Sequence, residues 1–420
     1  MLKDLIKKIA PSFLIGWYHL LLAFFGAVIY GFPSRKMVVI GITGTKGKST
    51  VIEFCHQIFQ EAGYKVASLS SIRFKIKNEE TSNSLKMTMP GRFKIQRFFK
   101  KALVSGCKYM ILEVTSEGIL QHRHEFINFD AAVFTNLSPE HIERHGSFEN
   151  YRSAKGDFFK AVKKTHIINL DDENTAFFLQ FPAMRKWGYS TKISNNFLDP
   201  KFQTVTADNI EISEGGTSFS VNGTKIKLNV CGRFNVLNAL AAICVGLSQN
   251  IGLEVSSSAL AKVRGIKGRM EIVIKKPFKV VVDYAHTPDA LQKVYESFYG
   301  KSRLLCILGS AGGGRDKWKR PKMGEIAAKY CDEIIITNED PYDEEPIEII
   351  NQVSLGTGQK AKKILDRREA IKEALKNAKP GDAVVITGKG CEPWMCVSGG
   401  KKIPWDERKI VEEEFKKISK

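Results

Sequence analysis

The chain has 420 residues, 43% hydrophobic and 26% charged, a composition typical of a folded globular protein with room for two or three domains. Its formal net charge is +19, but Lys and Arg are spread along the chain without an Arg-rich arm or an aromatic-interleaved basic repeat. Nucleic acid is therefore not an expected partner, and the charge favours phosphorylated substrates or anionic lipid. The eight cysteines include no CxxC pair, which excludes a zinc ribbon and predicts free thiols in a reducing cytosol.

Residues 13–32 form an apolar run in which only His19 is strongly polar. The run has the length of a membrane-spanning helix, and a shallow or re-entrant membrane helix fits it equally well. A helix packed on its own domain is the third alternative. Because the run is apolar on all faces, we expect membrane contact through residues 13–32. No small-residue cleavage site follows the run, so a signal peptide is not expected, and we place the protein in the cytoplasm at the inner face of the membrane.

Residues 37–50, MVVIGITGTKGKST, carry the strongest local signal. A run of β-formers enters a turn of small residues, and an apolar-periodic segment over 51–62 predicts a helix after it. Strand, glycine loop and helix together cradle a nucleotide's phosphates: Lys48 reaches the β- and γ-phosphates and the Ser49 hydroxyl ligates Mg²⁺. The first glycine of the general pattern falls on Ile42. The predicted ATP-binding loop comprises Gly44, Thr45, Lys46, Gly47, Lys48, Ser49 and Thr50.

Strands and helices then alternate along the chain. Strands are predicted at 64–69, 108–114 and 131–134, with a helix over 95–104 and another over 232–246. After a basic passage at 262–268, a second α/β pattern has strands at 278–282, 303–308, 333–337 and 383–387. The predicted fold is α/β: a central P-loop ATPase domain (37–265) with a mostly parallel sheet and a C-terminal Rossmann-like domain (266–420), preceded by an apolar N-terminal helix (1–36).

Polar residues gather where the predicted strands end. Glu113, Thr115 and Ser116 follow one strand, with Gln121 to Arg123 close behind, and Glu140, His141, Glu143 and His145 follow another. Carboxylates beside a phosphate loop are plausible Mg²⁺ or substrate ligands, with zinc as the alternative for the histidines. The histidines also fit ordinary surface positions, and the glycines of 309–319 and 388–390 fit ordinary turns.

In this order the motifs resemble the Mur ligases, most closely those of the MurE type. The resemblance covers residues 37–410 and is carried by GITGTKGKST, EVTSEGILQHR, FTNLSPEHIERHGSFENYRSAK, GRFNVLNALAA, GRMEIV, VVDYAHTPDAL and GGGRDKWKRPKMG. It implies an ATP-dependent ligase that joins an amino acid to a muramyl-peptide-like acceptor through an acyl phosphate. It also implies roles for individual residues. Lys48, Glu113, His141 and Lys155 are the implied catalytic residues. The implied Mg²⁺ ligands are Ser49, Glu113, His141 and a carbamylated Lys155. The implied contacts to the acceptor are Thr115, Ser116, Gln121 and Arg123. The residues implied to bind the nucleotide are Asn235, Asn238, Arg269, Asp283, His286 and Lys319, and those implied to bind the substrates are Arg315, Asp340, Tyr342, Gly388 and Glu392.

Three departures from the family pattern bear on the substrates. Residues 1–36 are too short for the family's UDP-binding domain, which suggests a lipid-linked acceptor or a different mode of nucleotide binding. The DNPR motif of diaminopimelate-adding enzymes reads Asp340-Pro341-Tyr342, so lysine is favoured over diaminopimelate, with acidic residues 343–345 suited to its amine. The family's GKGHE motif reads GKGCE. Other amide ligases on this scaffold, such as poly-γ-glutamate or folylpolyglutamate synthetases, and a non-catalytic membrane-bound ATP-binding scaffold remain as alternatives.

Overall fold

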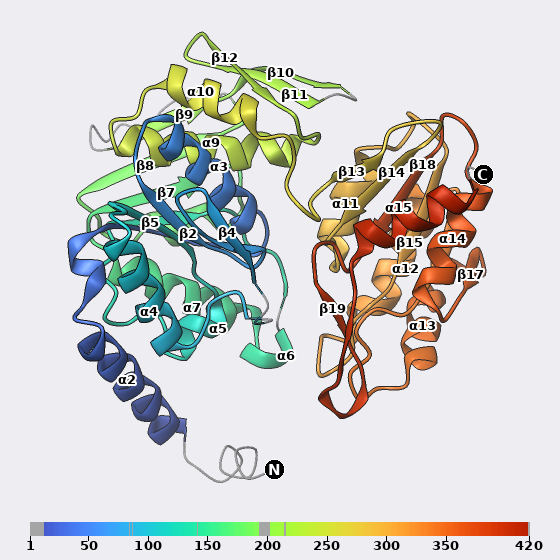
Figure 1. Ribbon diagram of the computed structural model, residues 1–420, viewed down its shortest axis with the longest axis horizontal. Helices are drawn as coiled ribbons and strands as arrows, with labels where there is room; N and C mark the ends of the chain where they lie inside the picture. Colours follow the sequence, from blue (N-terminus) through green and yellow to red (C-terminus); the bar gives the residue numbers. More distant parts are fainter. Residues whose placement is uncertain are drawn as a thin grey trace.

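The computed structural model describes residues 12–83, 85, 87–140, 142–192, 202–213 and 216–418, and shows two α/β bodies side by side (Figure 1). His141, a predicted catalytic residue and metal ligand, lies outside the described residues. Two sheets organise these bodies: a nine-stranded sheet built before residue 207 and a six-stranded sheet built after residue 270. The predicted division at 265/266 falls between the last strand of the first half and the first strand of the second, and it stays a prediction.

The larger sheet has the strand order β4-β3-β2-β5-β1-β6-β7-β8-β9. All neighbours are parallel except the β2-β3 and β3-β4 pairs. Its strands are β1 (Val38–Thr43), β2 (Val66–Leu69), β3 (Arg73–Ile76), β4 (Glu79–Ser82), β5 (Tyr109–Glu113), β6 (Ala131–Phe134), β7 (Thr165–Asn169), β8 (Arg185–Ser190) and β9 (Phe202–Thr206). Central strands buried on both faces need apolar side chains throughout, which is why these segments read as continuous apolar runs.

Helices cover both faces of this sheet. One hydrophobic core lies between the sheet and α3, α9 and α10, and the other lies between the sheet and α4 and α7. The helices are α3 (Lys48–Glu61), α4 (Arg92–Val104), α5 (Ser116–Leu120), α6 (Ile142–His145), α7 (Phe148–Ala161), α8 (Thr175–Leu179), α9 (Arg233–Ser248) and α10 (Leu253–Lys262). A small antiparallel sheet, β10 (Asp208–Ser213), β11 (Gly216–Val221) and β12 (Thr224–Leu228), packs on α10.

The second sheet has the order β13-β14-β18-β15-β16-β17, parallel except for β13. Its strands are β13 (Glu271–Ile274), β14 (Lys279–Asp283), β15 (Leu304–Leu308), β16 (Glu333–Ile336), β17 (Ala361–Lys363) and β18 (Ala383–Thr387). Around them lie α11 (Pro288–Glu296), α12 (Lys319–Tyr330), α13 (Pro346–Ser354), η2 (Leu355–Thr357), α14 (Arg367–Asn377), β19 (Trp394–Cys396), η3 (Ser398–Gly400), β20 (Lys402–Pro404) and α15 (Glu407–Ile418). The predicted fold class, α/β with two mostly parallel sheets, is confirmed.

The apolar N-terminal segment forms α2 (Ser12–Ile29), followed by the short helix η1 (Pro33–Lys36). α2 ends before Gly31 and Phe32, both of which adopt positive φ, and it packs its Ala23 and Ala27 face against the protein beside α4. In the portion of the chain that the structure describes, no helix is long and apolar enough to cross a membrane. The expected membrane contact through residues 13–32 stays a prediction.

The polar residues 73–82, for which no element was predicted, fold as the antiparallel pair β3-β4, because Arg73 and Lys75 form ion pairs with Glu53 of α3 and hold the strands on the sheet edge. The expectation of free thiols needs one correction. Cys306 and Cys331 form a disulfide rather than two free thiols, since β15 and the end of α12 bring them together. The other six cysteines form no disulfide and remain thiols, as predicted.

Candidate active site

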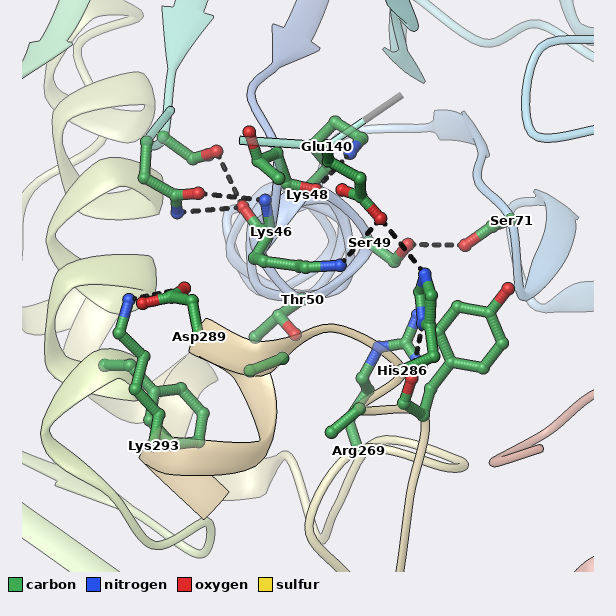
Figure 2. A pocket seen from close by; sticks show the side chains of 18 of the residues that line it. Lys46, Lys48, Ser49, Thr50, Ser71, Glu140, Arg269, His286, Asp289 and Lys293 are labelled. Carbon is green, nitrogen blue, oxygen red and sulfur yellow. Dashed lines mark hydrogen bonds and ion pairs between the residues drawn. The ribbon is translucent and has the colours of Figure 1, made fainter. Parts of the chain in front are cut away.

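A cavity of about 1020 Å³ lies where the two bodies meet, with the N-terminal end of α3 at its centre. Its walls come from the ends of β1 and β5, from α9, and from the turns after β14, β15 and β16 of the second body. In a parallel sheet all strands present their carboxyl ends at one edge, so both sheets direct their loops into this space. Figure 2 shows the side chains around the end of α3.

The phosphate loop between β1 and α3 is held open by two glycines. Gly44 has φ +146 and Gly47, the N-cap of α3, has φ +83, conformations that disfavour other residues. The Lys48 ammonium folds back and donates to the carbonyls of Gly44 and Thr45, both at 2.9 Å. Asn136, which follows β6, accepts from the Lys46 N–H through Oδ1 at 2.9 Å. The loop is thus shaped before any ligand arrives, with the helix N-terminus facing the cavity.

Ser49 and Glu113 form the candidate cation site. Glu113 Oε2 accepts from the Ser49 hydroxyl at 2.9 Å and from the Ser71 N–H at 3.0 Å, while Oε1 lies 3.6 Å from Lys48 Nζ. A carboxylate and a hydroxyl are the oxygen donors that Mg²⁺ prefers, so this pair fits part of a magnesium shell completed by phosphate and water. Within the described ranges, no three His, Cys, Asp or Glu side chains converge on one point.

Lys155 lies directly behind the phosphate loop. Its side chain projects from α7, is 1% exposed, donates to the Gly44 carbonyl at 3.0 Å and lies 4.6 Å from the centre of the Tyr151 ring. Burial lowers the pKa of the Lys155 amine well below its usual value, and the Lys48 cation lowers it further. The lowered pKa favours the neutral, nucleophilic amine, which is the form that reacts with CO₂.

Glu140 connects the two bodies. Its Oε1 accepts from Lys46 Nζ at 3.0 Å and lies 3.1 Å from His286 Nε2, which belongs to the turn after β14 (Figure 2). Burial lowers the pKa of His286 to about 3, and the Lys46 cation acts in the same direction. The His286 ring faces two oxygen acceptors, because Nε2 lies 3.1 Å from Glu140 Oε1 and Nδ1 lies 2.7 Å from the Tyr284 carbonyl. Lys319 donates to the backbone carbonyl of His286 at 3.0 Å.

A second contact between the bodies involves backbone groups. The Glu143 N–H donates to Asp316 Oδ1 at 3.0 Å, and the Lys317 N–H donates to Glu143 Oε1 at 3.1 Å. Glu140 and Glu143 flank the segment that contains His141, so the block between β6 and α7 faces the second body from the cavity rim. The sequence indicated Glu140 only as a candidate Mg²⁺ or substrate ligand, and its contact with His286 of the other half could not be predicted from it.

Asn235 and Asn238 project from the first turns of α9. Asn238 Nδ2 donates to Asn235 Oδ1 at 3.1 Å, and Asn235 Nδ2 donates to the Cys231 carbonyl at 2.8 Å. A Cβ placed on Gly47 would lie 2.3 Å from Asn238 Oδ1, so the phosphate loop and α9 touch at this point. Asn238 lines the cavity, whereas Asn235 supports it from behind.

The predicted acceptor residues occupy the segment from the end of β5 through α5. Thr115 caps α5 by accepting from the Gly118 N–H at 3.1 Å, and the Ser116 hydroxyl contacts His145 Nε2 at 3.1 Å. Arg123 donates to Gln121 Oε1 at 2.6 Å and to the Met89 carbonyl. Since Arg123 lines the cavity with two neutral partners, its charge is available to an anionic ligand.

Arg315 and Tyr342 face each other in the second body. Arg315 donates to the Tyr342 hydroxyl at 3.3 Å, and its guanidinium lies 5.1 Å from the centre of the ring. Tyr342 has φ +54, a left-handed conformation that is costly for a bulky residue and often marks functional loops. Lys389 Nζ forms ion pairs with both Asp340 Oδ1, at 2.9 Å, and Glu392 Oε2, at 2.5 Å.

Two acidic residues expected to receive an amine point elsewhere. Asp343 accepts from Ser398 and from the Gly399 N–H, and Glu344 forms an ion pair with Arg320 at 3.0 Å. Neither lines the cavity, so the expected acidic site at 343–345 is wrong. Glu339 lines the cavity instead, with Oε2 buried and lacking a hydrogen-bond partner, and burial raises its pKa to about 7.

Arg269 and Asp283 have structural contacts in addition to their place on the cavity wall. The Arg269 guanidinium stacks 4.4 Å from the centre of the Tyr284 ring. Asp283 accepts from the N–H groups of Met270 and Ala285, both at 2.7 Å, and so fixes the turn after β14. Burial raises the pKa of Asp283.

Most of the predicted site residues meet in this one cavity. Those that line it are Thr45, Lys46, Gly47, Lys48, Ser49, Thr50, Glu113, Thr115, Ser116, Arg123, Asn238, Arg269, Asp283, His286, Arg315, Lys319, Asp340, Tyr342 and Glu392. Those that support it from behind are Gly44, Gln121, Lys155, Asn235 and Gly388. Ser71 lines it as well, and no motif in the sequence pointed to this serine.

Comparison with known proteins gives matches over both bodies. The profile of the Mur ligase middle domain matches residues 42–246, and that of the Mur ligase glutamate ligase domain matches residues 268–390. The chain is 36% identical over 407 residues to the UDP-N-acetylmuramoyl-L-alanyl-D-glutamate–2,6-diaminopimelate ligase of Syntrophomonas wolfei, covering 93% of this chain and 81% of that protein.

Two solved structures are similar in fold. One is a UDP-N-acetylmuramoyl-L-alanyl-D-glutamate–2,6-diaminopimelate ligase, 28% identical with a TM-score of 0.62, for which the match covers 91% of this chain and 79% of that one. The other is the folylpolyglutamate synthase of Mycobacterium tuberculosis complexed with ADP and AMPPCP, 16% identical with a TM-score of 0.71, covering 88% and 92%. The second likeness concerns the fold alone.

Proposed function

The chain belongs to the Mur ligase family, and on that basis we propose that it is an ATP-dependent, ADP-forming ligase of peptidoglycan precursor synthesis. It joins an amino acid to a muramyl-peptide-like acceptor. The observation that carries the proposal is the single cavity that holds a phosphate loop, a Ser49–Glu113 pair and, on the opposite wall, the charged residues of the second body. ATP, acceptor and amino acid each find polar groups there.

In the first step the terminal carboxylate of the acceptor attacks the γ-phosphorus of ATP. A phosphorus–oxygen bond forms, the bond to the β-phosphate oxygen breaks, and an acyl phosphate and ADP result. Lys48 and the N–H groups at the start of α3 counter the negative charge on the transferring group. For this role, Lys48 must give up its hydrogen bonds to the carbonyls of Gly44 and Thr45 and donate to phosphate oxygens instead.

In the second step the amine of the incoming amino acid attacks the acyl carbon. The carbon–nitrogen bond forms, inorganic phosphate leaves with the electrons of the carbon–oxygen bond, and the nitrogen loses a proton. Arg315 is suited to hold the α-carboxylate of the amino acid, because its described partners are a carbonyl and a hydroxyl. Arg315 and Tyr342 line the same cavity as the phosphate loop, which supports an amino-acid site there.

Mg²⁺ fits the site through Ser49 and Glu113, with His141 and Lys155 as the further implied ligands, and when bound it neutralises phosphate charge. We propose that Lys155 carries a carbamate: its neutral amine adds to CO₂, a carbon–nitrogen bond forms and one proton is released. The burial of Lys155 and its lowered pKa support this step. The carbamate would replace a buried amine by an anionic oxygen ligand of the kind that Mg²⁺ prefers.

The identity of the amino acid is the most specific part of the proposal. We favour a diamino acid with one carboxylate, such as lysine, over diaminopimelate, because Tyr342 stands where diaminopimelate-adding enzymes have arginine. Glu339, with its unpartnered carboxyl oxygen on the cavity wall, supports a site for the second amine. The names of the relatives favour diaminopimelate, so it is the competing substrate.

The amino-acid proposal is tested by direct competition. Purified protein is given ATP, the muramyl dipeptide acceptor and equal concentrations of lysine and diaminopimelate, and the products are separated by mass. We expect the lysine adduct to dominate. A product that contains only diaminopimelate would overturn the preference while leaving the ligase assignment intact. We also propose that the reaction runs in the cytoplasm, where ATP is available, at the inner face of the membrane.

A further inference from the structure

α2 places its large apolar side chains away from the protein. Its outer face follows helical spacing of three and four residues. Residues of this face include Trp17 at 62% exposure and Ile29 at 66%. The outer face comprises Leu14, Trp17, Tyr18, Leu21, Phe24, Phe25, Val28 and Ile29. The opposite face, with Ala23 and Ala27 buried, is the one that contacts the protein. This arrangement leaves an apolar patch in water that a monomeric protein ordinarily covers.

The inner side of α2 is firmly seated, so the outer face is not a by-product of a detached helix. Gly26 allows close approach to α4, since a Cβ there would lie 3.6 Å from backbone atoms of Arg92 and Phe93. At the border of the outer face, the Phe24 ring is 41% exposed and still meets the Phe126 ring edge-on at 5.4 Å between centroids. In Figure 1 α2 extends from the corner of the central body that lies farthest from the C-terminal body.

Basic side chains surround this corner. α4 and η1, the elements that flank α2, expose Lys94, Arg97, Lys100, Lys101, Arg35 and Lys36. α4 contains no acidic residue, so this basic rim carries one sign of charge. Phe93 and Val104 of α4 are also exposed and extend the apolar surface between the charges. An apolar strip with interfacial aromatics inside a basic rim matches the surface of an anionic bilayer.

We propose that the outer face of α2 and its basic rim dock this protein on anionic lipid headgroups, with α2 lying in the plane of the interface. A second copy of the chain is the competing occupant, but a two-fold contact would place two basic rims against each other. A bilayer offers apolar depth and negative charge at once. This inference specifies how the proposed ligase meets the membrane and adds to that function.

Docking at this corner would also orient the active site. α2 contacts the segment that runs from α5 to β6: a Cβ on Gly16 would lie 3.9 Å from His122 Nε2, next to Arg123 on the cavity wall. The acceptor side of the cavity therefore lies on the same flank as α2. An acceptor held by a lipid carrier could reach it without leaving the surface.

The test is co-sedimentation of the full chain with vesicles, without ATP or substrates. We expect binding to vesicles of phosphatidylcholine with phosphatidylglycerol, and at least about 10-fold weaker binding for the double variant W17S/F25S. The matched control M184S/L355S, which removes two side chains that are 73% and 76% exposed elsewhere, should bind as wild type does. The pair K100Q/K101Q should lose about 10-fold on anionic vesicles, while K360Q/K409Q should not.

A second readout is fluorescence quenching and uses a conservative variant. Brominated lipid should quench tryptophan fluorescence in the wild-type protein, and W17F should lose the part of that quenching that comes from Trp17. Equal binding of wild type and W17S/F25S, or no binding at all, would overturn the proposal. So would a dimer in light scattering that W17S/F25S converts to a monomer. Each of these results leaves the ligase activity to be judged by its own assay.

Discussion

Replacing Gly47 by alanine tests how closely the phosphate loop is fitted to α9. A Cβ at this position would lie 2.3 Å from Asn238 Oδ1, whereas ordinary van der Waals contact begins at 3.4 Å. Either the Asn238 side chain leaves its present position beside Asn235, or the loop and the helix separate by about 1 Å. A displacement of about 1 Å in a catalytic group costs roughly 100-fold in rate. We therefore expect G47A to lower kcat/KM for ATP about 100-fold.

Gly63 supplies a matched control at the other end of α3. Its φ is +80, close to the +83 of Gly47, and a Cβ there meets nothing within 4 Å. Both alanine variants should lose roughly 1–2 kcal/mol of stability from the left-handed backbone, measured by urea unfolding. Only G47A should lose ATP affinity and ADP release. If G47A turned over ATP as G63A does, the assumed contact between the loop and Asn238 would be wrong.

The remaining predictions concern Lys155, the buried histidines and Tyr342. K155M should reduce ADP release at least about 100-fold. The midpoint of urea unfolding should change little, because an apolar chain of similar length fills the same buried space. Activity near that of wild type would exclude a metal-ligand role for Lys155. Burial lowers the pKa values of His56 and His166 from 6.5 to about 4. Between pH 6.5 and pH 4 these two histidines are therefore protonated in the unfolded chain but not in the folded one. The free energy of unfolding should accordingly fall as pH drops from 6.5 towards 4, by up to about 3 kcal/mol for each histidine. If the unfolding free energies of wild type and H166Q changed in parallel over that range, His166 would not contribute to this pH dependence. Y342R should raise kcat/KM for diaminopimelate relative to lysine at least about 10-fold, through a new guanidinium–carboxylate pair, and Y342F should not. An unchanged ratio in Y342R would mean that the distal carboxylate of diaminopimelate does not lie beside residue 342.

The fold could be predicted largely from local pattern. Segments 131–134 and 383–387 coincide with β6 and β18 because apolar β-formers buried in a parallel sheet form uninterrupted runs. β3 and β4 could not be read from the sequence, since their side chains are polar and their stability depends on Glu53, about twenty residues earlier on another element. The disulfide between Cys306 and Cys331 likewise depends on the packing of α12 against β15.

The candidate site shows the same division between local and non-local information. The phosphate loop could be located from its own residues, since strand, glycines and helix are contiguous. The contacts of Glu140 with His286 and of Ser71 with Glu113 could not be predicted, because the partners lie far apart in the sequence. Resemblance to the family indicated Lys155, and the structure adds the physical reason why this lysine differs from exposed ones: it is 1% exposed.

The central claim is tested most directly by a turnover assay that measures ADP release and product mass together. Purified protein with ATP and Mg²⁺ should release ADP only when both a muramyl dipeptide acceptor and an amino acid are present. One amide product should form for each ADP, with the mass of the two substrates less one water. ADP release that ignores the acceptor, or no amide product with either a UDP-linked or a lipid-linked acceptor, would contradict the assignment of this chain as an amide-forming ligase.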